Sequence, residues 1–247
     1  MPLGPQRSFR HIVLSAVISG WITGMLITLV QQFTTGPLIA QAEIYEQRGE
    51  KPAEKNTVAE VAAGAPHDQD AELWKPKNSF ERTFYTGVTT VLVAIGYALL
   101  LGACLSQMRT ASWRTGLALG VAGFLVFQLA PALGLPPEPP GAPYADLVAR
   151  QLWWVGTAIA TASALGAWFY TRSNSKAIWI PVGIVLILLP HVIGVPQALE
   201  RQVSIVPHEL SQRFALAALI TTAAFWLALG SIQGYVFGRL CQRGARG

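Results

Sequence analysis

The feature that most constrains this chain is the grouping of its apolar residues into long blocks. The blocks lie near residues 11–31, 84–106, 113–133, 151–170, 177–195 and 213–237. Each is roughly twenty residues long, which is the length that an α-helix needs to cross a bilayer. Lipid admits only helices and closed barrels, and the ten-residue alternation of a barrel is absent. We therefore expect an all-α integral membrane protein, a bundle of six transmembrane helices that forms one membrane domain over residues 1–247.

The composition agrees with this class. Hydrophobic residues make up 52% of the chain and charged residues 13%, whereas a soluble domain has roughly a quarter of its residues charged. The net charge of +5 comes from cations beside helix ends, not from one basic face, so it does not indicate nucleic-acid binding. The motifs HExxH, GxSxG and Walker A are absent, and we expect no enzymatic activity.

The charged residues predict how the bundle is oriented. With a cytoplasmic amino terminus, the inner segments hold nine cations and no acid, namely Arg7, Arg10, Arg109, Arg114, Arg172, Lys176, Arg239, Arg243 and Arg246. The outer segments hold the other nine of the 18 Lys and Arg and all 13 Asp and Glu. This is the positive-inside pattern, and it places both termini in the cytoplasm.

The first apolar block has two interpretations, a cleaved signal peptide or a retained helix. Its apolar core is longer than the 7 to 15 residues of a signal peptide, and the small-residue sequence Ala40-Gln41-Ala42 lies about ten residues beyond it. We therefore expect a retained helix. Three sets of glycines at a spacing of four suit close helix contact, and an oligomer through these faces is one prediction: Gly20 with Gly24, Gly116 with Gly120, and Gly230 with Gly234 and Gly238.

The first block ends in a polar stretch, QQFTTGPLIAQAEIYE, at residues 31–46. Glu43 and Glu46 are spaced i, i+3, so in a continuing helix they share one side and could hold a cation together. Gln31 and Gln32 lie deeper, and such amides either bridge helices or replace the water around a passing ion. The alternative is that any membrane helix needs a polar end.

Two outer segments carry further candidate metal ligands. The polar loop of residues 47–82 contains His67, Asp68 and Asp70, which offer an imidazole and carboxylates to a divalent metal or are ordinary solvated charges. His208 and Glu209 form a second outer pair just before the last block, close to the same face as Glu43 and Glu46.

His191 is the most informative polar residue of the fifth block. It follows Pro190 in IPVGIVLILLPHVIGVPQ, roughly 21 Å from the inner end of the helix at 1.5 Å per residue. The proline predicts a kink beside the ring. Ionisable groups at such depth often mark ion paths, and imidazole is a ligand for borderline metals. A helix-end histidine bonded to a neighbour is the alternative.

The segment of residues 133–154 is too rich in proline to be helical before Tyr144. Glu138, Asp146 and Arg150 either line a mouth or form a surface ion pair. Gln128 lies near the outer end of the third block. Like Gln31 and Gln32, its amide either bridges two helices or replaces water around a passing ion.

Four of these stretches, in this order and in a chain of this size, resemble the CbtA family of predicted cobalt transporter subunits: QQFTTGPLIAQAEIYE, FERTFYTGV, LPPEPPGAPYADLVARQLWW and LLPHVIGVPQ. The resemblance implies uptake of cobalt across the bacterial inner membrane for cobalamin synthesis. It also implies a small single-span partner, CbtB, with a histidine-rich end. Family members often have a histidine-rich first outer loop, whereas this loop has His67 alone, which shifts the expected metal contacts toward the membrane.

The leading hypothesis is therefore a transporter subunit that moves a divalent metal inward, cobalt first and nickel second, without its own ATP hydrolysis. No permanently bound cofactor is expected. The main alternative is a membrane scaffold that stabilises a partner protein through the glycine faces.

Overall fold

The computed structural model describes residues 5–50, 79–108, 110–143, 145–170, 176–197 and 204–244. Throughout these residues the only regular structure is helical. The elements in chain order are α1 (Pro5–Phe33), α2 (Thr35–Glu50), α3 (Ser79–Ser106), α4 (Trp113–Phe124), the π-helical turn η2 (Leu125–Leu129), α5 (Ala130–Ala132), α6 (Leu147–Tyr170), α7 (Lys176–Ile193) and α8 (His208–Gly244). The predicted all-helical class is thus confirmed for the described residues.

Five stretches are long and apolar enough to cross a membrane: Phe9–Phe33, Phe80–Ser106, Trp113–Ala132, Leu147–Phe169 and His208–Arg243. Each overlaps one of the predicted blocks. The fifth predicted block corresponds to α7, where the apolar helix Trp179–Ile193 is shorter than the others. A sixth span therefore stays a prediction.

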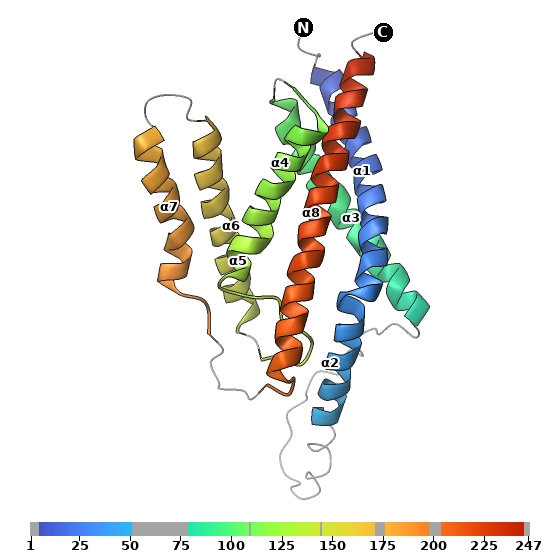
Figure 1. Cartoon of the computed structure of the whole chain (residues 1–247), viewed down its shortest axis with the longest axis vertical. Coiled ribbons are helices and arrows are strands. Elements are labelled where there is room, and N and C mark those ends of the chain that lie inside the picture. Colours follow the sequence, from blue (N-terminus) through green and yellow to red (C-terminus); the bar gives the residue numbers. More distant parts are fainter. Residues whose placement is uncertain are drawn as a thin grey trace, which may run out of the picture.

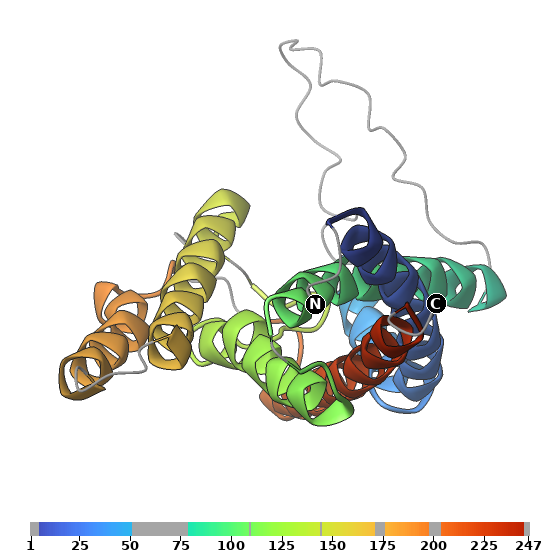
Figure 2. The same ribbon diagram turned by 90° about the horizontal axis from the view of Figure 1, so that it is seen from above.

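The helices form a bundle with a separate pair at one side (Figure 1). Helix α1 begins and α8 ends at the same end of the molecule. Helices α1, α3, α4 and α8 pack on one another, while α7 lies beside α6 and away from α1 and α3, as the view along the bundle also shows (Figure 2).

Glycines bring α4 and α8 into backbone contact. A Cβ atom added at Gly116 would lie 2.1 Å from the Gly230 carbonyl oxygen, and one added at Gly234 would lie 2.7 Å from the Gly116 Cα. Gly120 likewise faces Trp226 and Gly230. No side chain fits there, so these helices approach as closely as small-residue interfaces allow.

The glycines of α1 serve the contact with α3. Added Cβ atoms at Gly20 and Gly24 would each lie 2.6 Å from a backbone Cα of α3, in Ile95 and Val91 respectively. All three predicted glycine faces are thus occupied within the chain, including Gly238, which faces Ala111. An oligomer would need another surface.

A proline and a glycine separate α1 from α2. Pro37 cannot donate the backbone hydrogen bond that a continuous helix would need, and Gly36 packs against the Gln31 carbonyl. Helix α2 then packs against the start of α8 through Ala42, Val206 and Leu210. The predicted extension of the first helix is therefore a second helix, which we call the elbow helix.

Two local features differ from the expectation. The third block contains the π-helical turn η2, where the backbone N–H of Ala130 donates to the carbonyl of Leu125; Pro131, which has no N–H, follows directly. Helix α6 begins at Leu147, not Tyr144. Asp146 caps it, because its Oδ1 accepts from the Ala149 N–H at 2.9 Å.

Candidate functional site

A polar pocket of about 410 Å³ lies where α1, the elbow helix and α3 meet. Gln31, Gln32 and Thr35 line it from the α1–α2 junction, and Arg82, Thr83 and Thr86 line it from α3. We call it the elbow pocket. It contains both glutamines of the polar stretch that the sequence singled out, at the end of the bundle opposite the start of α1 (Figure 1).

Glu43 is held by Arg82. The Arg82 guanidinium donates to both carboxylate oxygens of Glu43, at 2.9 and 3.1 Å, a two-point ion pair between side chains that are 51% and 29% exposed. Glu46 lies one turn further, against the turn at Gly141. The two acids thus lie on the elbow helix and not on a continuation of α1, and Glu43 has a cationic partner at the pocket rim.

From the elbow pocket toward the start of α1, a row of polar side chains runs along the buried side of α1. Ser15, Ser19 and Thr23 are each 0% exposed and are spaced by four residues. The row ends near His11 toward the start of α1 and near Gln31 at the elbow pocket. From His11 to Gln31 the helix rises roughly 30 Å, about the thickness of the hydrocarbon core. We call these five residues the α1 row.

Gln233 of α8 faces this row and is also 0% exposed. Its Nε2 donates to the Ser15 Oγ at 3.0 Å, and the Ser15 hydroxyl donates to the Ile12 carbonyl at 3.0 Å. The second bond fixes the amide orientation, because Ser15 then needs a donor and not an acceptor. Gly102 of α3 leaves space for the amide, since a Cβ there would lie 2.8 Å from the Gln233 Nε2.

Four of the five residues of the row each have one buried side-chain atom without a hydrogen-bond partner. Among the described residues, six buried side-chain nitrogen or oxygen atoms lack one: His11 Nδ1, Ser19 Oγ, Thr23 Oγ1, Gln31 Oε1, Gln233 Oε1 and His191 Nε2. Four of the six are on α1, and a fifth faces it from α8. Each such atom costs about 1–3 kcal/mol if nothing satisfies it. This accumulation on one helix face therefore calls for a polar occupant such as water or an ion.

Ser19 and Thr23 differ from the other hydroxyls in this respect. Thr28 of the same helix donates to the carbonyl four residues back, at 2.8 Å, and Thr161 of α6 does the same. That local bond is the usual way to satisfy a hydroxyl in a membrane helix. At Ser19 and Thr23 the bond is absent, so both hydroxyls are free to meet a polar occupant.

His191 lies on the separate α6–α7 pair. Its ring packs edge-to-face against Trp153 with centroids 5.5 Å apart, and the Trp153 Nε1–H donates to the Pro190 carbonyl at 3.2 Å. The Nε2 atom of His191 is buried without a partner. The structure thus places His191 on a helix that packs on α6, whereas Glu43 and Glu46 lie on the elbow helix beside α8.

The other predicted ligands are dispersed or undescribed. The His208 and Gln212 side chains are hydrogen-bonded, Nε2 to Nε2, at 2.9 Å, and Glu209 pairs with Arg213 at 2.7 Å. His67, Asp68 and Asp70 lie outside the described residues. Within the described residues no three His, Cys, Asp or Glu side chains are grouped so that they could hold a metal ion.

The sequence reasoning missed the α1 row. Ser15, Ser19 and Thr23 repeat at an interval of four next to Gly20 and Gly24, and this spacing alone would have placed them beside a tightly packed helix face. What no local pattern shows is that Gln233, more than two hundred residues away, bonds to Ser15.

The comparisons with known proteins identify the family. The family model described as "Probable cobalt transporter subunit (CbtA)" matches residues 9–238, nearly the whole chain. The chain belongs to the CbtA family. The match extends from the start of the α1 row to beyond Gln233. Searches of curated proteins and of solved structures found no match.

Proposed function

We propose that this CbtA-family chain is the membrane subunit of a cobalt importer, and that the metal crosses between α1, α3 and α8 along the α1 row. The observation that supports this path is that several buried oxygen and nitrogen atoms on α1 and Gln233 have no hydrogen-bond partner. In a bilayer such atoms are costly unless they serve a polar occupant. Family membership supplies the identity of the metal.

In this proposal the elbow pocket is the entry. Cobalt exchanges part of its water shell for the amide oxygens of Gln31 and Gln32, then for the hydroxyls of Thr23 and Ser19 and the Oε1 of Gln233. His11 receives it at the far end, where an imidazole suits a borderline metal better than a hydroxyl does. From Thr23 to His11 the groups are one helical turn apart, roughly 6 Å. Gln31 and Thr23 are two turns apart, roughly 12 Å, with the buried Ile27 between them.

The direction follows from the predicted orientation. With both termini cytoplasmic in a bacterial inner membrane, the elbow pocket faces outward and His11 inward. A negative-inside potential then favours inward movement of a dication by roughly 2.3 kcal/mol per charge per 100 mV. No ATP hydrolysis by this chain is part of the proposal, and nickel is the expected second substrate.

The family description as a subunit supports a partner, and a small single-span CbtB-like protein is our candidate. The rival function is a scaffold that recruits its partner through the glycine faces. All three faces already contact other parts of the same chain, so they are not available to a partner.

Cobalt accumulation in cells that lack other cobalt uptake systems tests the proposal. Ser19→Ala and Thr23→Val remove a hydroxyl with little change in volume. We expect each to lower the initial uptake rate about tenfold, which corresponds to about 1.4 kcal/mol in the barrier. Protein level in the membrane should stay normal.

Two matched substitutions serve as controls. Ser231→Ala and Thr90→Val remove exposed hydroxyls that donate to carbonyls of their own helices, those of Leu227 and Thr86. Both should keep wild-type uptake. Normal uptake by Ser19→Ala and Thr23→Val together would contradict the path, and no cobalt uptake by the wild-type chain with its partner would contradict the function.

A further inference from the structure

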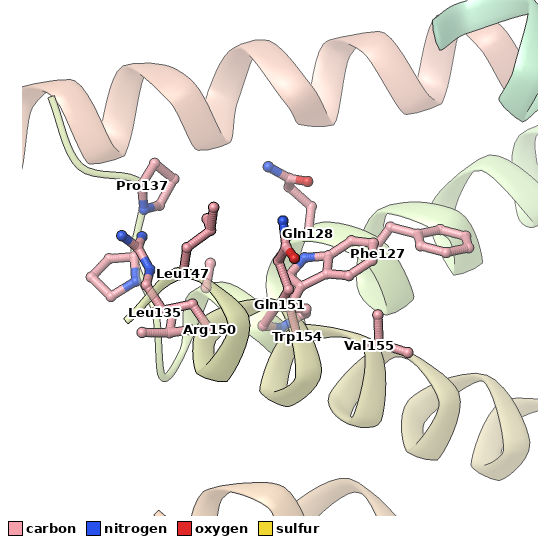
Figure 3. Close-up of a pocket in the computed structure, with 12 residues that line it drawn as sticks. Phe127, Gln128, Leu135, Pro137, Leu147, Arg150, Gln151, Trp154 and Val155 are labelled. Atoms are coloured by element: carbon pink, nitrogen blue, oxygen red, sulfur yellow. The ribbon is translucent and has the colours of Figure 1, made fainter. Parts of the chain in front are cut away.

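A second cavity, of about 670 Å³, lies between η2, α5, the proline segment that follows and the first turns of α6 (Figure 3). It shares none of its lining residues with the elbow pocket. The volume is in the range of sites for small organic molecules and far exceeds that of a single metal ion.

Aromatic rings and prolines form a stiff wall of this cavity. The Phe127 and Trp154 rings are stacked with centroids 6.1 Å apart, and Phe127 also stacks on Trp226 of α8 at 5.5 Å with 4° between the ring planes. Pro131, Pro136 and Pro137 line the other side. Such a wall changes shape little, so the cavity is preformed.

Three polar side chains line the same cavity. Gln128 is carried by η2, and Gln151 by the second turn of α6; both line the cavity (Figure 3). Arg150 lies at the end near Pro137. π-helical turns often occur at functional sites, and here the turn carries both Gln128 and Phe127 of the wall.

The charges at this cavity are those of Arg150 and of its partner Glu138. Arg150 is its one charged lining residue among those described, and the carboxylate of Glu138 pairs with the Arg150 guanidinium at 3.4 Å. Burial raises the pKa of Glu138, although Arg150 acts in the opposite direction. Guanidinium and primary amide N–H groups are the donors that recognise carboxylates.

From this arrangement we propose that the cavity binds a small organic carboxylate, and that cobalt reaches the protein as a chelate of such an anion. The part about the chelate rests on the proposed function. In this assignment Arg150, Gln128 and Gln151 hold free carboxylate oxygens, and the aromatic wall contacts the carbon skeleton. The segment that lines the cavity at Pro136 and Pro137 continues to Gly141, which contacts Glu46 on the elbow helix. The bound chelate is thereby placed near the acids that lead to the elbow pocket.

Binding to the purified full chain in detergent tests this proposal without any transport assay. The probes are citrate, the 1:1 cobalt(II)–citrate complex, cobalt(II) alone and glycerol phosphate as a soluble lipid headgroup. Thermal unfolding and titration calorimetry report binding. We expect citrate and its cobalt complex to stabilise the protein saturably, and Gln151→Leu and Gln128→Leu each to weaken citrate binding about tenfold, the effect expected for one charge-assisted hydrogen bond.

Gln107→Leu, an exposed glutamine at the other end of the bundle, is the matched control and should bind citrate as the wild type does. The proposal would be overturned if the wild-type protein did not bind citrate. It would also be overturned if Gln151→Leu and Gln128→Leu both bound citrate as tightly as the wild type. Stabilisation by glycerol phosphate in place of citrate would assign the cavity to a lipid headgroup and overturn it as well. If the protein binds citrate but does not take up cobalt, the cavity is still a carboxylate site, and only the proposed transport function is refuted.

Discussion

Helix α8 has two interfaces of opposite character. Toward α4 it presents Gly230, Gly234 and Gly238, and the two backbones touch with no room for a side chain. Toward α1 it presents Gln233 to a row of buried hydroxyls, several of them without partners. The first interface shows that this chain can join helices tightly by van der Waals packing alone.

The contrast bears on why the second interface is polar. If hydroxyls and amides served only to hold helices together, they would be expected to satisfy one another. Gln233 with Ser15, and Thr221 with Thr34 at 3.1 Å, do so. Ser19, Thr23 and the Oε1 of Gln233 do not. We therefore interpret the α4–α8 interface as structural and the α1–α8 interface as functional.

The largest effect is expected at the glycine interface. Gly230→Ala would place a Cβ 2.4 Å from the Gly116 carbonyl oxygen, and backbone cannot yield as a side chain can, so we expect at least about 3 kcal/mol of destabilisation. Size-exclusion of the solubilised protein should show loss of the folded species. Gly96→Ala and Gly156→Ala, where an added Cβ meets nothing within 4 Å, should fold normally. If Gly230→Ala folds normally, the α4–α8 interface is not the tight structural contact that we infer.

The next effect separates stability from transport at Gln233. Gln233→Leu keeps the volume and removes a buried partnerless oxygen, while Ser15 retains its bond to the Ile12 carbonyl. We expect the melting temperature to stay the same or rise, and cobalt uptake to fall about tenfold. A lowered melting temperature with unchanged uptake would make Gln233 a structural residue and the α1–α8 interface a second packing interface.

The smallest effect is expected at the elbow pocket rim. Glu43→Gln leaves the Arg82 charge without its partner beside the entry, so the apparent KM for cobalt should rise about threefold, with maximal rate and stability little changed. The effect should shrink at high ionic strength, because the pair is partly exposed. Arg82→Gln together with Glu43→Gln should restore the KM. A KM unaffected by either change would exclude this rim from the path.

The sequence was sufficient for the class of fold. Blocks of apolar residues do not depend on tertiary contacts, so five of the predicted spans coincide with long apolar helices. The break at Gly36-Pro37 and the turn around Pro131 were also visible as residues, but their outcomes, a separate elbow helix and a π-helical turn, depend on how neighbouring helices satisfy the freed backbone groups.

The candidate site was harder to predict from the sequence, because it depends on contacts between residues that are far apart in the chain. Glu43 was recognised as an acid at a helix exit, but its partner Arg82 lies 39 residues further along the chain. Ser19 and Thr23 are ordinary residues in a membrane helix until their hydroxyls are found buried without a partner. The Nε2 atom of His191 is buried, but α7 packs on α6, apart from the elbow helix. Its role as a metal ligand stays a prediction.

The most direct test of the central claim is whether cobalt reaches the α1 row. Ser19→Cys, made in a chain that also carries Cys104→Ser and Cys241→Ser, places one thiol in the row, and a thiolate binds cobalt(II) more strongly than a hydroxyl does. The purified protein should show a sulfur-to-cobalt charge-transfer absorption when cobalt(II) is added, and Ser231→Cys in the same background should not. A folded Ser19→Cys protein without this absorption would contradict the account.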